Sequence, residues 1–317
     1  MELPPRLDYD CEEDWLRLLG FVGRLRDAAL SGEHKKITLD FSDVETLSVE
    51  AAVLLVAEIH RCSSFLGRRT QITGTYPRDP AISSLLTEIG FFKALDIREP
   101  LLPKSYAPVT FVQIERGNRT DAELANRLLD CFTHVFAFEP ADRRRLHVAL
   151  IECMDNVYQH AYAEPGRNPY LLNEWWLVGF ADEASSTISF TFYDQGAGIP
   201  TTIRRKQHKR IADRLRHWND AKWLERAVQK GVSRLSSKRR GYGLTKLNEF
   251  VRELQVIGSL TVVSNLGAVI FPSTSSVRLH PLSVGLKGTL VTWQLTGISN
   301  IQVSDATHDH IADVSLP

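Results

Sequence analysis

The chain has 317 residues, 43% of them hydrophobic, and its 38 basic and 38 acidic side chains give a formal net charge of zero. This length and composition fit a globular protein with room for two domains, and they offer no overall charge to attract nucleic acid. Cys11, Cys62, Cys131 and Cys153 form no CxxC or Cys/His pattern, so disulfides and a zinc site are not expected. The N-terminus is acidic, unlike a signal peptide, and no apolar run reaches the ~18–20 residues of a membrane span. We therefore expect a cytoplasmic protein that does not enter membranes.

The N-terminal part of the chain alternates helical and strand-like patterns. We expect helices at 11–31, 48–62 and 79–95 and strands at 36–41 and 70–76. Ser48 is placed to cap the second helix, and Pro80 falls in the first turn of the third. This order indicates a small α/β domain over residues 1–98, followed by a proline-bearing linker at 99–109.

A second domain, residues 110–300, mixes strands and helices before a short polar tail at 301–317. Strands are expected at 110–115, 174–182, 186–194, 258–272 and 288–295, and helices at 122–136, 143–161 and 245–254. The sequence Asn-Leu-Gly at 265–267 is typical of a hairpin turn. The mixture of elements predicts an α/β (α+β) fold class for the whole chain.

The stretch IECMDNVYQHA, residues 151–161, places Glu152, Asn156 and His160 four residues apart. Because an α-helix turns about 100° per residue, side chains at this spacing form one stripe. The apolar residues of the same helix fall on a different face: Leu146, Leu150, Cys153 and Val157. A solvated helix surface would give the same polar stripe, so this pattern needs support from other motifs.

A second motif is FYDQGAGIP, residues 192–200, where a predicted strand ends at Asp194. Gly196 and Gly198 would let the chain approach a flat ligand closely. An ionised carboxylate only accepts hydrogen bonds, which suits an exocyclic amine such as N6 of adenine. The alternative is an ordinary glycine turn with a solvated aspartate.

A third motif is RRGYGLTKLNEF, residues 239–250, in which Gly241 and Gly243 precede a predicted helix. The free N–H groups and the dipole at a helix N-terminus favour an anion. The spacing is that of neither a P-loop nor a Rossmann phosphate loop, and a simple turn role fits this motif equally well.

Taken in this order, the motifs resemble the GHKL ATPase superfamily over about residues 108–297. The boxes of that family correspond to Glu152 and Asn156 (N box), to Asp194, Gly196 and Gly198 (G1 box), and to Gly241, Gly243 and Leu244 (G2 box), with Gly288 and Thr289 as a weaker last element. The resemblance implies a Bergerat fold, an α/β sandwich whose mixed sheet carries helices on one face. It also implies binding of ATP and Mg²⁺.

By this resemblance Asn156 holds the Mg²⁺ that bridges the triphosphate, since Mg²⁺ takes oxygen ligands and keeps several waters. Glu152 corresponds to the carboxylate that activates the attacking hydroxyl or water as a general base. Asp194 would bind adenine, and the loop ending at Gly243 would close over the phosphates. His160 matches a position found in the serine-kinase branch, and a packing or helix-end role is also open for it.

Residues 199–240 correspond to the variable ATP lid of the family and are strongly basic. They would contact the γ-phosphate, dock an acidic partner, or form solvated surface. The segment is long, and we expect a folded insertion with apolar anchors at Leu215, Trp218, Leu224 and Val228.

The N-box form with a histidine, joined to a small α/β module, is most similar to the anti-sigma-factor type serine/threonine kinases. The sequence contains neither the two-helix hairpin of histidine kinases nor the transducer domain of gyrase and mismatch-repair relatives. The N-terminal module resembles a STAS domain, but SVEA at 48–51 stands where that family has its phosphoacceptor DSSG. We therefore expect a docking or autoregulatory role for this module.

These resemblances imply an ATP-dependent serine/threonine protein kinase in a partner-switching system, with a regulatory protein partner similar to an anti-sigma-factor antagonist. A non-catalytic ATP-gated interaction module is one alternative, and an ATPase with nucleotide-driven closure of a homodimer is another. Nucleic acid is not an expected partner, because the basic lid lacks interleaved aromatic residues. A kinase would need Glu152, whereas a gate would depend mainly on Asn156 and Asp194.

Overall fold

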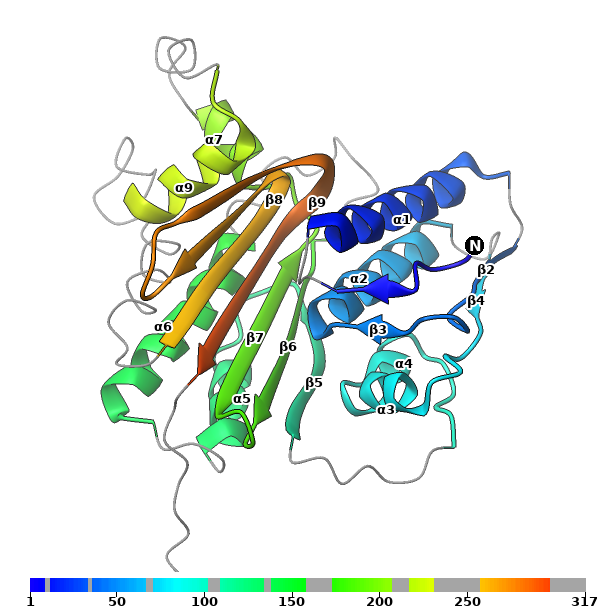
Figure 1. Cartoon of the computed structure of the whole chain (residues 1–317), viewed down its shortest axis with the longest axis horizontal. Helices are drawn as coiled ribbons and strands as arrows, with labels where there is room; N and C mark the ends of the chain where they lie inside the picture. Colours follow the sequence, from blue (N-terminus) through cyan, green and yellow to red (C-terminus); the bar gives the residue numbers. More distant parts are fainter. Residues whose placement is uncertain are drawn as a thin grey trace, which may run out of the picture.

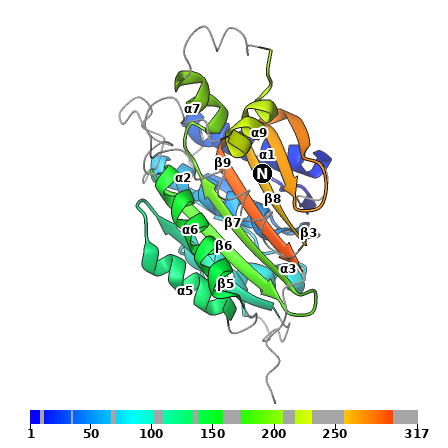
Figure 2. The ribbon, with the colours of Figure 1, turned by 90° about the vertical axis from the view of Figure 1, so that its left-hand side faces the viewer.

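A central five-stranded sheet organises the chain, and helices pack against both of its faces (Figure 1, Figure 2). The computed structural model describes residues 1–8, 12–33, 36–66, 71–101, 109–133, 138–157, 173–206, 217–230 and 257–296. The predicted mixture of helices and strands is confirmed within these ranges. The predicted helix at 245–254, most of the linker and the tail lie outside them.

The N-terminal unit alternates helices with short strands, as its sequence predicts. Its helices are α1 (Glu12–Ser31), α2 (Val49–Leu66), α3 (Pro80–Glu88) and α4 (Phe91–Ala94). Its strands are β1 (Arg6–Leu7), β2 (Lys36–Leu39), β3 (Thr46–Leu47) and β4 (Gln71–Gly74). The strands pair in parallel, β1 with β3 and β2 with β4.

The helix boundaries in this unit follow from identifiable capping residues. Ser48 caps α2, since its Oγ accepts a hydrogen bond from the Ala51 N–H at 3.2 Å. Asp79 caps α3, with Pro80 in the first turn. The single helix expected at 79–95 is two helices, because Gly90 takes a left-handed φ of 74° between them.

The central sheet has the strand order β5-β6-β7-β9-β8. Its strands are β5 (Val109–Gly117), β6 (Trp175–Asp182), β7 (Thr187–Asp194), β8 (Ile257–Pro272) and β9 (Arg278–Thr296). Every described pairing in it is antiparallel, so the expected mixed sheet is wrong for these strands. Short connections join β6 to β7 and β8 to β9, and strands joined by short turns pair antiparallel.

The hairpin turn expected at 265–267 is also wrong, because β8 runs through these residues and its turn into β9 lies at 273–277. Asn265 has a φ of 51°, and the strand register shifts beside it. It therefore forms an irregularity within the strand. An asparagine with positive φ is as suited to a bulge as to a turn. The local sequence therefore could not distinguish a bulge within a strand from a hairpin turn.

Helices α5 (Ala122–Thr133) and α6 (Pro140–Asn156) of the second part of the chain lie on one face of the sheet, as Figure 2 shows, and helices of the N-terminal unit cover the other face. These helices of the N-terminal unit are α1 and α2 (Figure 1). Strand β7 shows the division: Phe190 and Phe192 pack with α5 and α6, whereas Tyr193 packs with α1 and α2.

One hydrophobic cluster is shared between the N-terminal unit and the sheet, rather than each domain having a separate core. It joins residues of α1 and α2 to Trp176, Val178 and Tyr193. Residues 51–57 of α2 are all fully buried, because this helix packs against α1 on one side and the sheet on another. An α-helix that is apolar all round is expected to be buried in this way.

Part of the predicted lid is folded, as expected from its apolar residues. It contains α7 (Ile199–Lys206) and α9 (Asp220–Lys230). Leu224 and Val228 of α9 are buried in the cluster that also contains α5 and α6, and Trp218 lies edge-on to Trp223. The predicted anchor Leu215 lies outside the described residues.

Candidate functional site

Three polar side chains form a row at one end of the central sheet. Asp194, the last residue of β7, pairs with Thr289 of β9, which in turn pairs with Ser264 of β8. The Ser264 Oγ donates a hydrogen bond to the Gly288 carbonyl at 2.7 Å and lies 3.2 Å from the Thr289 Oγ1. Strand alternation places all three side chains on the face covered by α5 and α6.

The Asp194 carboxyl group is buried, with 7% of the residue exposed. Its Oδ1 accepts a hydrogen bond from the Gly196 N–H at 2.8 Å, and the Thr289 side chain also hydrogen-bonds to it. Burial raises the pKa of Asp194 from 3.8 to about 7, although both of these hydrogen bonds act in the opposite direction. A buried carboxyl group that titrates near neutrality is a recognised mark of functional sites.

Helix α6 approaches this carboxyl group through Cys153. Burial raises the pKa of the Cys153 thiol, and the negative charges of Asp194 and Glu152 raise it further. The thiol therefore lies within electrostatic range of both carboxylates. Asn156 is the half-buried last residue of α6, one turn beyond Glu152 and three residues beyond Cys153. The polar stripe of α6 thus lies beside the helix face that packs toward the end of β7.

The loop after Asp194 is fixed to β8 by hydrogen bonds. The Asn265 Nδ2 donates to the Ala197 carbonyl at 3.2 Å, and the Ile199 N–H donates to the Ser264 Oγ at 3.0 Å. Gly198 has a φ of 85°, and a side chain there would collide with Asn265. Gly198 therefore allows the tight turn of a loop that hydrogen bonds hold against β8.

A further glycine is required where β9 passes this loop. Gly288 has a φ of 104°, and an added Cβ would overlap the Asp194 carbonyl oxygen. The close passage of the two backbones sets the position of Thr289 beside Asp194. In the Gly-Thr motif, Gly288 therefore allows the close backbone contact and Thr289 places its side chain beside Asp194.

The folded part of the predicted lid, α7 and α9, is anchored next to the same loop. The Asp220 Oδ2 accepts a hydrogen bond from the Leu266 N–H at 2.8 Å, and Asp220 also pairs with Arg204 of α7. A Cβ on Gly267 would overlap the backbone of Ala221, so α9 and β8 are in direct backbone contact. The base of the lid is therefore held against the sheet.

The structure brings four of the predicted site residues together at the end of β7 and places two others on α6. The four at the end of β7 are Asp194, Gly196, Gly198 and Thr289, and the two on α6 are Glu152 and Asn156. The other predicted site residues lie outside the described residues: His160, Gly241, Gly243 and Leu244. Their predicted roles stay predictions.

Sequence reasoning missed Ser264, Asn265 and Gln195 as parts of this site. Ser264 is fully buried in the structure, but other polar residues of β8, such as Ser259 and Thr261, give the sequence no signal that sets it apart. Asn265 was assigned to a turn. Gln195 carries no pattern of its own, because its partner is a backbone carbonyl of a distant helix.

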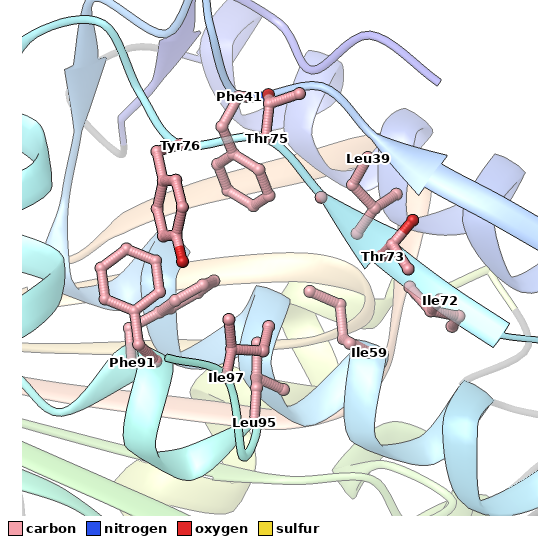
Figure 3. Close-up of a pocket in the computed structure, with 12 residues that line it drawn as sticks. Leu39, Phe41, Ile59, Ile72, Thr73, Thr75, Tyr76, Phe91, Leu95 and Ile97 are labelled. Carbon is pink, nitrogen blue, oxygen red and sulfur yellow. The ribbon is translucent and has the colours of Figure 1, made fainter. Parts of the chain in front are cut away.

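An apolar pocket of about 40 Å³ lies in the N-terminal unit, between the small sheet of β2 and β4 and helix α4 (Figure 3). Its lining is mostly aliphatic and aromatic: Leu39, Phe41, Ile59, Ile72, Thr73, Gly74, Thr75, Tyr76, Phe91, Phe92, Leu95 and Ile97. A cavity of roughly 150 Å³ holds one benzene molecule, so this pocket is far too small for a nucleotide.

Comparisons with models of known protein families and with curated proteins give no match for this chain. Among the described helices, none combines the length and the apolar character needed to span a bilayer. Within the same residues, no three His, Cys, Asp or Glu side chains are grouped so as to hold a metal ion.

Proposed function

We propose that this chain binds ATP with Mg²⁺ at the end of β7 and acts as a serine/threonine protein kinase in a partner-switching system. The observation that supports this most is the buried Asp194 carboxyl group, with Thr289 beside it and Cys153 of α6 within electrostatic range of it. Asp194 corresponds to the adenine-binding position of the GHKL superfamily, and Glu152, next to Cys153 on α6, corresponds to a position of its N box.

The chemistry of the residues fits these roles. In its ionised form, Asp194 would accept a hydrogen bond from the adenine N6 amino group. Since burial brings the pKa of this carboxyl group to about 7, nucleotide binding should weaken as the pH falls below that range. Asn156 would supply an amide oxygen to Mg²⁺, with phosphate oxygens and waters as the remaining ligands. Glu152 would accept the proton of an attacking serine or threonine hydroxyl.

The proposal is tested by titration with ATP and Mg²⁺ and by phosphoryl transfer from labelled ATP to candidate protein partners. Asp194→Asn should abolish tight ATP binding, whereas Asp182→Asn, at the opposite end of the sheet, should leave it intact. Glu152→Gln should keep ATP binding and lose phosphoryl transfer, with Glu123→Gln on α5 as the matched control. Absence of ATP binding by the wild-type protein would refute the proposal.

A second candidate is an ATP-gated interaction module without catalysis. The packing of α2 against the sheet favours it, because α2 contacts the loop that follows Asp194 directly. A gate would bind ATP and change its affinity for a protein partner, with Glu152→Gln having no effect. Nucleotide-driven closure of a homodimer would instead give ATP turnover that depends on protein concentration.

A further inference from the structure

Gln195 connects the candidate adenine site to the N-terminal unit. It follows Asp194 directly and is fully buried. Its Nε2 donates a hydrogen bond to the carbonyl oxygen of Ala57, in the middle of α2, at 2.8 Å. The two residues are separated by 138 positions in sequence, so this contact exists only because α2 packs on the sheet.

Helix α2 is held rigidly at this position. Glu58, the residue after Ala57, is fully buried and accepts two hydrogen bonds from Arg26 of α1, both at 2.8 Å. It accepts a third from Arg61 at 2.7 Å. Two-pronged guanidinium–carboxylate pairs of this kind fix orientation as well as adding energy. The carbonyl that receives Gln195 therefore belongs to a well-fixed part of α2.

Strand β9 restricts the position of the loop from the other side. The Tyr193 hydroxyl donates to the Lys287 carbonyl at 2.7 Å, and Gly288 passes in close backbone contact with Asp194. The position of the Asp194 carboxyl group is thus set from β9 on one side and from α2 on the other. Of these two supports, only the α2 contact comes from the N-terminal unit.

We propose that Gln195 is a positioning residue, which fixes the Asp194 loop on helix α2 and makes the N-terminal unit a structural part of the adenine site. This inference rests on the proposed ATP binding and deepens it. Any partner that alters the packing of α2 would change nucleotide affinity through this hydrogen bond, and nucleotide binding would in turn stabilise the packing of α2.

A comparison of ATP with inosine triphosphate isolates the positioning effect. At about pH 8, where the Asp194 carboxyl group is ionised, it accepts a hydrogen bond from the N6 amino group of adenine but none from the carbonyl oxygen that inosine carries at the same position. At this pH, correct placement of Asp194 therefore strengthens the binding of ATP and does not strengthen the binding of the inosine analogue. A general loss of stability would leave the ratio of the two affinities unchanged for the folded protein.

The test is equilibrium titration of the full chain with each nucleotide and Mg²⁺. Gln195→Met keeps the side-chain volume and removes the donor, and we expect ATP affinity to fall about fivefold to tenfold while inosine triphosphate affinity stays the same. Thr191→Val is the matched control. Thr191 also lies on β7 and faces α2, where its hydroxyl donates to Glu50 at 3.5 Å, but it is within the strand, three residues before Asp194. Its removal should leave both affinities unchanged.

An unchanged ATP preference in Gln195→Met would overturn the positioning role while leaving ATP binding by the wild type intact. Failure of the wild type to bind ATP would instead refute the underlying function. A second measurement uses the wild type alone, in case the variant does not fold. Hydrogen exchange of the α2 backbone near residues 55–61 should slow more with saturating ATP than with saturating inosine triphosphate. Equal exchange in both complexes would also overturn the inference.

Discussion

Replacing Asp194 by asparagine should make folding stability less dependent on pH. The wild-type carboxyl group is buried, and burial raises its pKa from 3.8 to about 7 in the folded chain. Its folded form therefore binds a proton more tightly than its unfolded form does. The resulting stabilisation is present in full below about pH 4 and is lost as the pH rises through about 7. Asparagine does not titrate, so the variant lacks this term.

The size of the effect follows from the shift itself. A change of about three pKa units, at about 1.4 kcal/mol per unit, gives about 4 kcal/mol. Between about pH 4 and pH 8, the free energy of unfolding of the wild type should fall by about this amount relative to Asp194→Asn. Other titrating groups cancel, because both proteins share them.

Denaturant unfolding of both proteins at about pH 4, 6 and 8 measures this difference. Asp182→Asn provides a control carboxylate at the opposite end of the sheet, where the side chain hydrogen-bonds to exposed turn residues. A difference between wild type and Asp194→Asn that stays constant across the pH range would refute the reasoning. In that case the carboxyl group is not desolvated in the folded state.

Three further predictions concern the support of the site. Gly288→Ala should lower the free energy of unfolding by about 3 kcal/mol, because the new Cβ overlaps the Asp194 backbone and φ is positive; an unchanged melting temperature would contradict this. Glu58→Gln should lower it by about 3–5 kcal/mol, because the buried Arg61 and the half-buried Arg26 lose the charge of their shared carboxylate partner; a free energy of unfolding equal to that of Glu50→Gln would contradict this. Asn156→Ala should weaken ATP binding in Mg²⁺ but not in a chelator, and equal weakening in both would exclude a metal role.

Local patterns predicted much of the structure near the site. The apolar face of α6, with Leu150 and Cys153 buried, is where its 3.6-residue period placed it. The strand ending at Asp194 and the apolar helix α2 were also predicted. In each case the residue pattern within one element determines the outcome.

What the sequence did not provide is the contact between distant elements. The continuous apolar run of α2 indicated a buried helix, but it did not identify the sheet as the surface that buries it. The hydrogen bond from Gln195 to the Ala57 carbonyl depends on that packing and involves a backbone atom. The turn predicted at Asn265 was wrong for a related reason. Its positive φ belongs to an irregularity within β8, and its side chain hydrogen-bonds to Ala197 in a loop that is distant in sequence.

The most direct test is a structure of the full chain bound to a non-hydrolysable ATP analogue and Mg²⁺. We expect the adenine N6 amino group to lie within hydrogen-bonding distance of an Asp194 carboxylate oxygen, and Mg²⁺ to be bound by the amide oxygen of Asn156. Adenine bound away from Asp194, or a metal ion held by the phosphates alone without Asn156, would contradict the proposed nucleotide site.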